Sequence, residues 1–386
     1  MLLSKVQLYL ALTIASCFIL QKVYVPLFLC APFFVKMRVN KSASPIIIAF
    51  AMALFWNLVV FLLNLRDASS LQMFKVVTVF VFVASVVGYI SSGTKEGKET
   101  VGKLFYPLVI ILALNSLHVF INVHKAGLWS MPFDGSMTSS AAYKIQNSGI
   151  YFGALNKNIW ATKFLFIFLC YCNYFVLGLR KFDKIHVLLI AIFALTVIYG
   201  MSRTSILGLL VYLTVLAAYK ISFTRFRVVF YLTVLPIVSV FAFNIISGFV
   251  HFTFDETDGF YSRVLLWRSI AEIDPLKFLA GSGQQYGAIH IPLYTGLDND
   301  NFHNVYLNQL VDTGVVGLFF YVFLYAAFLR AFIVEVGIKL AVTLFIPLFV
   351  VVNSHYTGYD NDIFVYLVMT LGVLNASVER NESSLH

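Results

Sequence analysis

The sequence predicts an all-α integral membrane protein with about twelve transmembrane helices. Of its 386 residues, 60% are hydrophobic and only 12% carry a charged side chain, whereas about 25% of the residues of a soluble domain are charged. Most apolar runs continue for the roughly 20 residues that a helix needs to cross a bilayer. A transmembrane β-barrel would instead show segments of about ten residues with alternating hydrophobicity. A helical bundle is therefore predicted.

Twelve apolar segments follow one another along the chain. The second is short, so the first two form either a tight hairpin or a re-entrant element. We expect residues 1–247 to hold helices 1–9, residues 248–313 to form one large external loop, and residues 314–386 to hold helices 10–12 and a short tail. The segments lie at about residues 6–21, 23–36, 46–64, 71–92, 104–123, 159–179, 185–201, 204–220, 227–247, 314–333, 337–353 and 361–377.

The basic residues of the loops predict how the bundle is oriented. Lys and Arg are more frequent in the loops that share a side with the N-terminus, such as 36–41, 180–184 and 220–227, than in the alternate loops. Cytoplasmic loops carry an excess of these residues. We therefore place both termini in the cytoplasm and the 248–313 loop on the opposite side of the membrane.

The sequence offers no site for a cofactor. The cytoplasmic loops are short and basic, and they contain no glycine-rich motif that binds nucleotides. The cysteines lie inside apolar runs without the spacing of metal ligands, and we interpret them as small hydrophobic side chains: Cys17, Cys30, Cys170 and Cys172. We expect neither a metal ion nor another cofactor.

Three arginines on the external side indicate an anion-binding site. Arg203 lies in a very short turn between the seventh and eighth predicted helices, and Arg263 and Arg268 lie in the large loop. External loops are normally depleted of Lys and Arg, so these guanidinium groups suggest a bound phosphate near the membrane surface. The alternative is that they snorkel at the interface or pair with the acidic side chains of residues 255–258.

The large loop predicts an amphipathic helix followed by a glycine turn. Residues 259–279 have the pattern of a helix lying against the membrane, with Arg263 and Trp267 on one face and Arg268 directed partly away. The Asp274-Pro275 pair ends or kinks this helix. The turn at Gly281–Gly283 has backbone amides that could approach a phosphate.

His303 is the candidate general base. Asp300 or Asn301 is expected to cap a new helix, which would place His303 in the first turn of that helix. The N-terminus of a helix lowers the pKa of a nearby histidine and favours the neutral imidazole that accepts a proton. Three other histidines are interpreted as solvated side chains without a catalytic role: His251, His290 and His355.

The motifs LNKNIWA (155–161), MSRTSILG (201–208), YSRVLLWRS (261–269), AGSGQQYG (280–287) and FHNVYLNQLVDTGVVG (302–317) resemble the O-antigen ligase and polymerase superfamily. This superfamily includes the WaaL-type ligases and the Wzy-type polymerases. The resemblance covers roughly residues 150–320. It implies a twelve-span bundle with a large periplasmic loop between the ninth and tenth spans, located in the bacterial inner membrane.

The resemblance also implies a reaction and roles for individual residues. The reaction is a metal-independent, inverting transfer of a glycan from undecaprenyl diphosphate. Arg203 and Arg263 match positions that contact the donor diphosphate, and His303 matches the position that activates the acceptor hydroxyl. Arg268, Asn304 and Asn158 match as supporting, substrate-binding residues, although Asn158 taken alone is explained by a helix cap.

We expect ligation of O-antigen to lipid A–core as the function, with membrane lipids around the protein and no nucleic-acid partner. The first alternative is an O-antigen polymerase, which uses the same residues and transfers the chain to the next lipid-linked repeat unit. A polysaccharide transporter is a further alternative, but it would place charged residues along a central path, and only Lys75 and Lys163 lie within predicted spans. A purely structural membrane protein would leave the external arginines unexplained.

Overall fold

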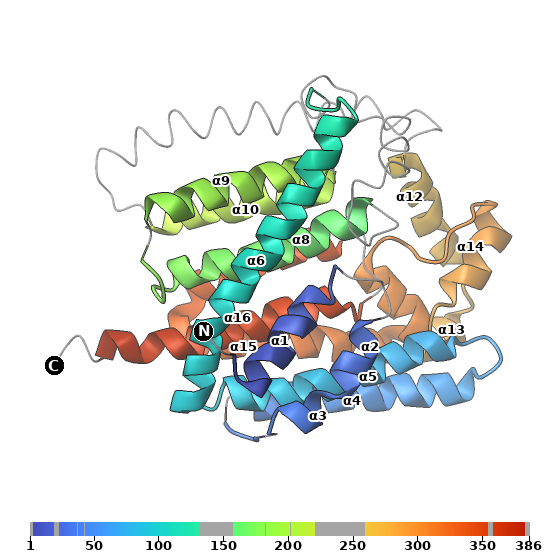
Figure 1. Ribbon diagram of the computed structural model, residues 1–386. Coiled ribbons are helices and arrows are strands. Elements are labelled where there is room, and N and C mark those ends of the chain that lie inside the picture. The colour runs from blue at the N-terminus through green and yellow to red at the C-terminus, as the bar shows by residue number, and fades with distance from the viewer. Residues whose placement is uncertain are drawn as a thin grey trace.

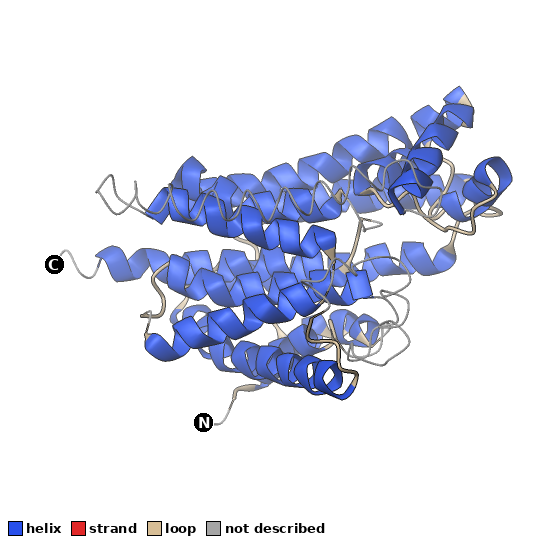
Figure 2. Ribbon diagram, turned by 90° about the horizontal axis from the view of Figure 1, so that it is seen from above, coloured by secondary structure: helices blue, strands red, loops and turns tan. Residues whose placement is uncertain are grey.

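The computed structural model is a bundle of α-helices, most of which run roughly parallel or antiparallel to one another, while the helix Lys95–Lys125 crosses its neighbours at a steep angle (Figures 1 and 2). It describes residues 3–18, 23–36, 38–41, 43–130, 157–181, 183–200, 202–220, 259–353 and 358–382. These residues form no β-strand. The predicted span 227–247 and His251 lie outside the described residues, as does His355.

The helices follow the predicted apolar segments. They are α1 (Lys5–Ala15), α2 (Tyr24–Leu29), α3 (Ala31–Phe34), α4 (Ser44–Leu63), α5 (Ser70–Ile90), α6 (Lys95–Lys125), α8 (Lys157–Val176), α9 (Lys184–Tyr199), α10 (Arg203–Lys220), α12 (Gly259–Arg268), α13 (Pro275–Ala280), α14 (Gly287–Thr295), α15 (Val305–Val352) and α16 (Asn361–Glu382). Side-chain caps begin several of them where the polar loops end: Ser69 caps α5, Thr94 caps α6 and Asp183 caps α9.

Five of the described helices are long and apolar enough to cross a membrane: α4, α5, α6, α8 and α15. Shorter apolar helices lie in α1, α9, α10 and α16, and the second predicted segment is divided into the short α2 and α3. An all-α membrane protein is thus supported, while the count of twelve spans stays a prediction.

The long helix α15 is interrupted twice, by Gly314 and by Gly337, both with positive φ angles. An unbroken helix of 48 residues would be roughly 70 Å long, more than twice the ~30 Å hydrocarbon core of a bilayer. The break at Gly337 divides it between the two segments predicted at 314–333 and 337–353. The break at Gly314 separates a polar first part, 305–313, from the apolar part that follows.

The short helices α12–α14 gather at one end of the bundle (Figure 1). The turn between α4 and α5 lies at the same end, where the Ser69 N–H donates to the Gln284 carbonyl oxygen at 2.9 Å. This end has a small hydrophobic core of its own, separate from the core of the bundle and formed by Leu266, Ile273, Ile291, Phe302 and Val311. The 259–313 segment is therefore a folded cap on the bundle.

A partly buried ion pair links α5 to the chain before α16. The Nζ atom of Lys75 lies 2.6 Å from Oδ1 of Asp360, and both side chains are less than one-fifth exposed. A charge with so little contact with water needs such a partner. Lys75 therefore has a structural explanation at the end of the bundle where the cap lies.

Candidate active site

The cap begins with α12, which carries two of the predicted arginines. The structure corrects the prediction of one helix over residues 259–279: α12 ends at Arg268, a short 3₁₀ helix covers Ser269–Glu272, and α13 begins after Asp274, which accepts the N–H of Leu276. The predicted break at Asp274-Pro275 is confirmed. Arg263 is half-buried, whereas Arg268 is exposed. The predicted difference between these two arginines is confirmed.

Trp267 ties α12 to the turn that carries His303. Its indole Nε1 donates to the carbonyl oxygen of Phe302 at 3.0 Å. The Phe302 side chain is fully buried in the small core, and its N–H donates to Oδ1 of Asn308 at 2.9 Å. Both backbone polar groups of the residue before His303 are thus satisfied by side chains of neighbouring helices.

His303 itself precedes the helix rather than starting it. The N-cap of α15 is Asn304, whose side chain accepts the N–H groups of Tyr306 and Leu307, so the expectation that Asp300 or Asn301 caps this helix is wrong. His303 has φ +50°, which is uncommon for a residue other than glycine. Its N–H donates to Oδ1 of Asn301 at 2.9 Å, and this bond holds the left-handed backbone.

The imidazole of His303 is kept neutral by its surroundings. Its pKa is lowered from 6.5 to about 4, mainly because burial disfavours the charged ring, and further because Arg263 is close enough to repel a second positive charge. Asp300 acts in the opposite direction. The neutral ring was predicted, but its cause is burial and Arg263 rather than position within a helix.

The glycine turn does not present its amides to a ligand. The N–H of Ser282 donates to the Val311 carbonyl and the N–H of Gly283 to the Asp312 carbonyl, both at 3.0 Å. A Cβ atom on Gly281 would lie 2.8 Å from the Asp312 carbonyl oxygen. The predicted contact of this turn with phosphate is therefore wrong: the glycines let the turn pack directly on the first part of α15.

Arg203 begins α10, a helix that packs along α15. One and a half turns later, a Cβ atom on Gly208 would meet Val351 at 3.1 Å. Two residues beyond Val351, the amide of Asn353 accepts a hydrogen bond from Asn304 at 3.3 Å. The start of α10 is thus linked through the end of α15 to the residue that follows His303.

Two supporting residues have clear places. Asn304, besides capping α15, links its two ends through Asn353. Asn158 is the second residue of α8, and its carbonyl accepts the hydroxyl of Thr162 at 2.7 Å, so it is not the residue before the helix. His290, expected to be solvated, is 2% exposed, and its Nε2 lies 2.7 Å from the Ser269 carbonyl.

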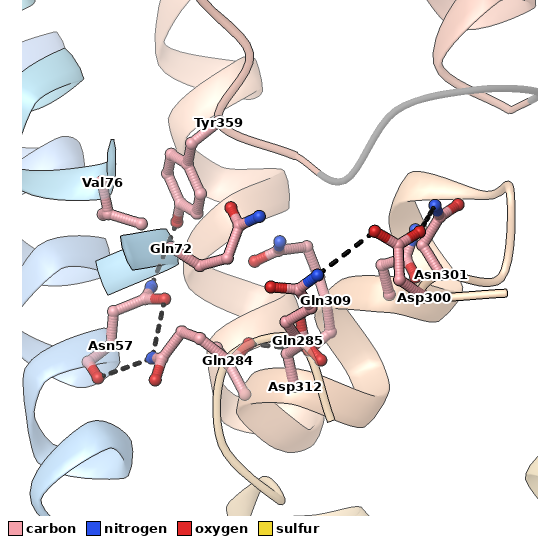
Figure 3. A pocket seen from close by; sticks show the side chains of 12 residues that line it. Asn57, Gln72, Val76, Gln284, Gln285, Asp300, Asn301, Gln309, Asp312 and Tyr359 are labelled. Carbon is pink, nitrogen blue, oxygen red and sulfur yellow. Dashed lines mark hydrogen bonds between the residues drawn. The ribbon is translucent and has the colours of Figure 1, made fainter. Parts of the chain in front are cut away.

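A polar pocket lies beside the His303 turn, where the cap meets α4 and α5 (Figure 3). Asparagine and glutamine side chains from distant parts of the chain gather in it, and the sequence analysis missed it. The signal available was the presence of two uncharged amides, Asn57 and Gln72, near the ends of otherwise apolar segments. The pocket is lined by Asn57, Gln72, Val76, Gln284, Gln285, Asp300, Asn301, Asn308, Gln309, Asp312, Thr313 and Tyr359. Over the described residues, no three His, Cys, Asp or Glu side chains come together in a group that could hold a metal ion.

Part of the sequence matches a known protein family. Residues 188–322 match the model of the O-antigen ligase family. The matched segment runs from α9 into α15 and includes Arg203, Arg263, Arg268, His303 and Asn304, but not Asn158. Neither the curated proteins nor the solved structures give a significant match. The segment 188–322 is thus similar to the O-antigen ligase domain, and the resemblance of this chain to the O-antigen ligase and polymerase superfamily is confirmed.

Proposed function

We propose that the protein transfers a polysaccharide from undecaprenyl diphosphate to lipid A–core, by a metal-independent reaction that inverts the anomeric centre. A membrane enzyme of polysaccharide biosynthesis follows from the matched domain and the apolar helices. The donor, the acceptor and the stereochemistry are the proposal. The location follows from them: the inner membrane, with both termini cytoplasmic and the cap in the periplasm.

In the proposed step, the neutral imidazole of His303 accepts the proton of an acceptor hydroxyl. The hydroxyl oxygen attacks the anomeric carbon of the donor sugar from the side opposite the diphosphate. The bond between that carbon and the phosphate oxygen breaks, and undecaprenyl diphosphate leaves with the bonding electrons. Arg203 and Arg263 stabilise the negative charge of the leaving group, because guanidinium groups bind phosphate oxygens through paired hydrogen bonds.

The observation that carries the proposal is the closeness of Arg263 and His303. A cation and a neutral imidazole lie on two elements of one folded cap, and the cation lowers the pKa of the imidazole. A diphosphate held at Arg263 would place the donor beside a group able to accept a proton. The beginning of α10, where Arg203 lies, is linked to the same turn through Asn353 and Asn304.

The alternative acceptor is a second lipid-linked repeat unit, which would make the protein a polymerase. A deletion of the gene in its host, followed by electrophoresis of the lipopolysaccharide, separates the two functions. If lipid A–core stays unmodified while full-length polymer accumulates on undecaprenyl diphosphate, the protein is the ligase. If single repeats still reach the core and long chains disappear, it is the polymerase. An unchanged ladder would contradict both.

Substitutions test the proposed roles in the same host. Arg203→Ala, Arg263→Ala and His303→Ala should each abolish transfer while the protein remains in the membrane at its normal level. Arg330→Ala is the matched control, because Arg330 is an exposed arginine of α15 that precedes the break at Gly337. Wild-type activity of Arg203→Ala or Arg263→Ala would contradict the role of that arginine in binding the diphosphate. Full activity of His303→Ala would contradict the role of His303 as the base.

A further inference from the structure

The polar pocket beside His303 is built from carboxamide groups. Figure 3 shows Gln72 and Gln309 between two groups of polar side chains, with Asn57, Tyr359 and the Gln284 amide that bonds to Asn57 on one side and Asp300 and Asn301 on the other. These residues come from α4, α5, the turn before α14, the turn before α15, α15 itself and the chain before α16. Six separate parts of the fold therefore contribute polar groups to one cavity.

Gln284 brings to this cavity a buried acceptor that the described residues do not satisfy. The side chain is 3% exposed, and its Nε2 donates to the carbonyl oxygen of Asn57 at 2.8 Å. Its Oε1 is buried and accepts no hydrogen bond from the described residues. Leaving a buried acceptor unsatisfied costs about 1–3 kcal/mol of folding free energy. A ligand that donates a hydrogen bond to this oxygen would offset that cost.

Gln72 offers a second amide that the protein does not use. Its backbone N–H donates to Ser69, but its side-chain amide takes part in none of the hydrogen bonds of the described residues. The Gln72 side chain lines the pocket and points into it (Figure 3). Its carbonyl and its NH₂ group are therefore available to a ligand as acceptor and donor.

The charges of the lining select the kind of ligand. Asp300 and Asp312 are the acidic side chains among the twelve lining residues, and no Lys, Arg or His is among them. Burial raises the pKa of Asp312 to about 7. A diphosphate would meet the Asp300 carboxylate here and no cation to balance its charge. A hydroxyl group fits better, because it donates one hydrogen bond and accepts two, and amides and carboxylates supply both kinds of partner.

The pocket also lies next to the proposed reaction centre. Asn301 lines the pocket and accepts the N–H of His303, and Asn308 lines it and accepts the N–H of Phe302. The residues that line the pocket are thus hydrogen-bonded to the backbone of His303 and of the residue before it. The cavity volume is about 20 Å³, which is enough for one small polar group. A single hydroxyl group of a larger ligand can therefore enter it.

We propose that this pocket binds uncharged hydroxyl-bearing groups of the saccharide that takes part in transfer, with Gln72 and the Oε1 atom of Gln284 as its two main partners. The inference rests on the proposed glycosyl transfer and adds a saccharide site distinct from the arginines that hold the diphosphate. In this proposal the amides determine which saccharide binds, and the arginines bind the diphosphate of the lipid-linked donor. Both donor and acceptor carry such hydroxyl groups.

Binding measurements on the purified full-length protein in detergent test the inference without requiring transfer. The probes are two labelled oligosaccharides without phosphate, one released from the host's lipid-linked precursor and one released from its lipid A–core, and inorganic pyrophosphate. Equilibrium dialysis should show binding of at least one oligosaccharide to the wild type. Gln72→Leu should weaken it three- to tenfold, as expected for one or two lost hydrogen bonds, and leave pyrophosphate binding unchanged. The oligosaccharide that responds identifies donor or acceptor.

Two further variants keep the test decisive. Gln284→Met keeps the approximate length of the side chain but removes the Oε1 acceptor, so it should also weaken oligosaccharide binding, provided that its thermal unfolding matches the wild type. Asn375→Leu is the control, since the Asn375 amide donates only within α16, to the Leu371 carbonyl, and it should bind as the wild type does. Equal binding by wild type and Gln72→Leu would overturn the inference, and so would a wild type that binds neither oligosaccharide.

The same experiment separates this inference from the proposed function. If the wild type transfers polysaccharide but Gln72→Leu binds oligosaccharide normally, only the saccharide pocket is wrong. If the wild type binds neither oligosaccharide nor pyrophosphate and transfers nothing, the proposed function fails together with the pocket.

Discussion

The indole of Trp267 donates a 3.0 Å hydrogen bond to the carbonyl oxygen of Phe302, and this bond fixes the last peptide before His303 against α12. Arg263 lies one helical turn before Trp267 on the same helix. The residue that lowers the pKa of the imidazole and the residue that positions its backbone therefore belong to one element. A rotation or shift of α12 would move both together.

Replacing Trp267 by Phe should reduce transfer without unfolding the protein. The aromatic ring is kept, but the hydrogen bond to Phe302 is lost, which is worth about 1 kcal/mol and loosens the His303 turn. We expect kcat/KM to fall about fivefold to tenfold in a reconstituted transfer assay. Trp129→Phe is the control, because Trp129 donates to His124 in the last turn of α6, away from the cap sequence. Equal activities of the two variants would show that the bond does not position His303.

The left-handed backbone of His303 allows its chemical and conformational roles to be separated. Both His303→Asn and His303→Val lack the imidazole, so both should lose transfer by a factor of at least about 100. Asparagine tolerates φ +50° far better than a β-branched residue does. The thermal unfolding temperature of His303→Asn should therefore stay near that of the wild type, while that of His303→Val falls. The same decrease in both variants would argue against a strained backbone at this position.

The pH dependence of transfer should show a base with a depressed pKa. Because the neutral ring is the active form, kcat/KM should be constant above about pH 5 and fall as the pH decreases through about 4. An ordinary histidine would give this decrease near pH 6.5. A diphosphate bound at Arg263 offsets the positive charge that lowers the pKa, so the decrease in kcat should occur at a higher pH than the decrease in kcat/KM. As a control for acid inactivation, samples returned from pH 4 to pH 7 must regain their activity. A single decrease at pH 6.5 in both parameters would contradict the role given to burial and Arg263.

Parts of this site could be predicted from the sequence because they depend on local spacing. Arg263 and Trp267 are four residues apart on one helix, and Asp274 before a proline marks a helix boundary. The cap of α15 could not be predicted in this way. Asp300, Asn301 and Asn304 are all good capping residues, and the choice is made by distant partners: Asn308 holds Phe302, and Asn353 bonds to Asn304.

The polar pocket was missed for a similar reason. Gln284 contacts Asn57, which lies 227 positions away in the sequence, and no local sequence pattern predicts such a contact.

The glycine turn was misassigned because a Gly-Ser-Gly sequence is compatible both with a phosphate-binding loop and with close backbone packing. Only the structure shows that the amides of Ser282 and Gly283 are used by carbonyl groups of α15.

The close packing at Gly281 predicts a large effect of one methyl group. In Gly281→Ala the new Cβ would lie 2.7 Å from the backbone carbon of Thr313, at φ +97°, and backbone atoms of α15 cannot move aside easily. Gly296→Ala is the matched control, because Gly296 also has a positive φ but nothing lies within 4 Å of its Cβ position. It should cost only about 1 kcal/mol. We expect Gly281→Ala to lower the unfolding temperature in detergent clearly more than Gly296→Ala and to reduce transfer. Equal shifts would mean that the turn does not pack on α15 as described.

The most direct test of the account is transfer by the purified protein in liposomes. The substrates are undecaprenyl-diphosphate-linked polysaccharide and lipid A–core, and both the glycosylated acceptor and the released undecaprenyl diphosphate are measured. We predict one released undecaprenyl diphosphate for each acceptor modified by the wild type, and neither product with Arg263→Ala or His303→Ala. Absence of product from the wild type, with lipid A–core and also with a second lipid-linked repeat as acceptor, would contradict glycosyl transfer. Wild-type rates in both variants would contradict the site.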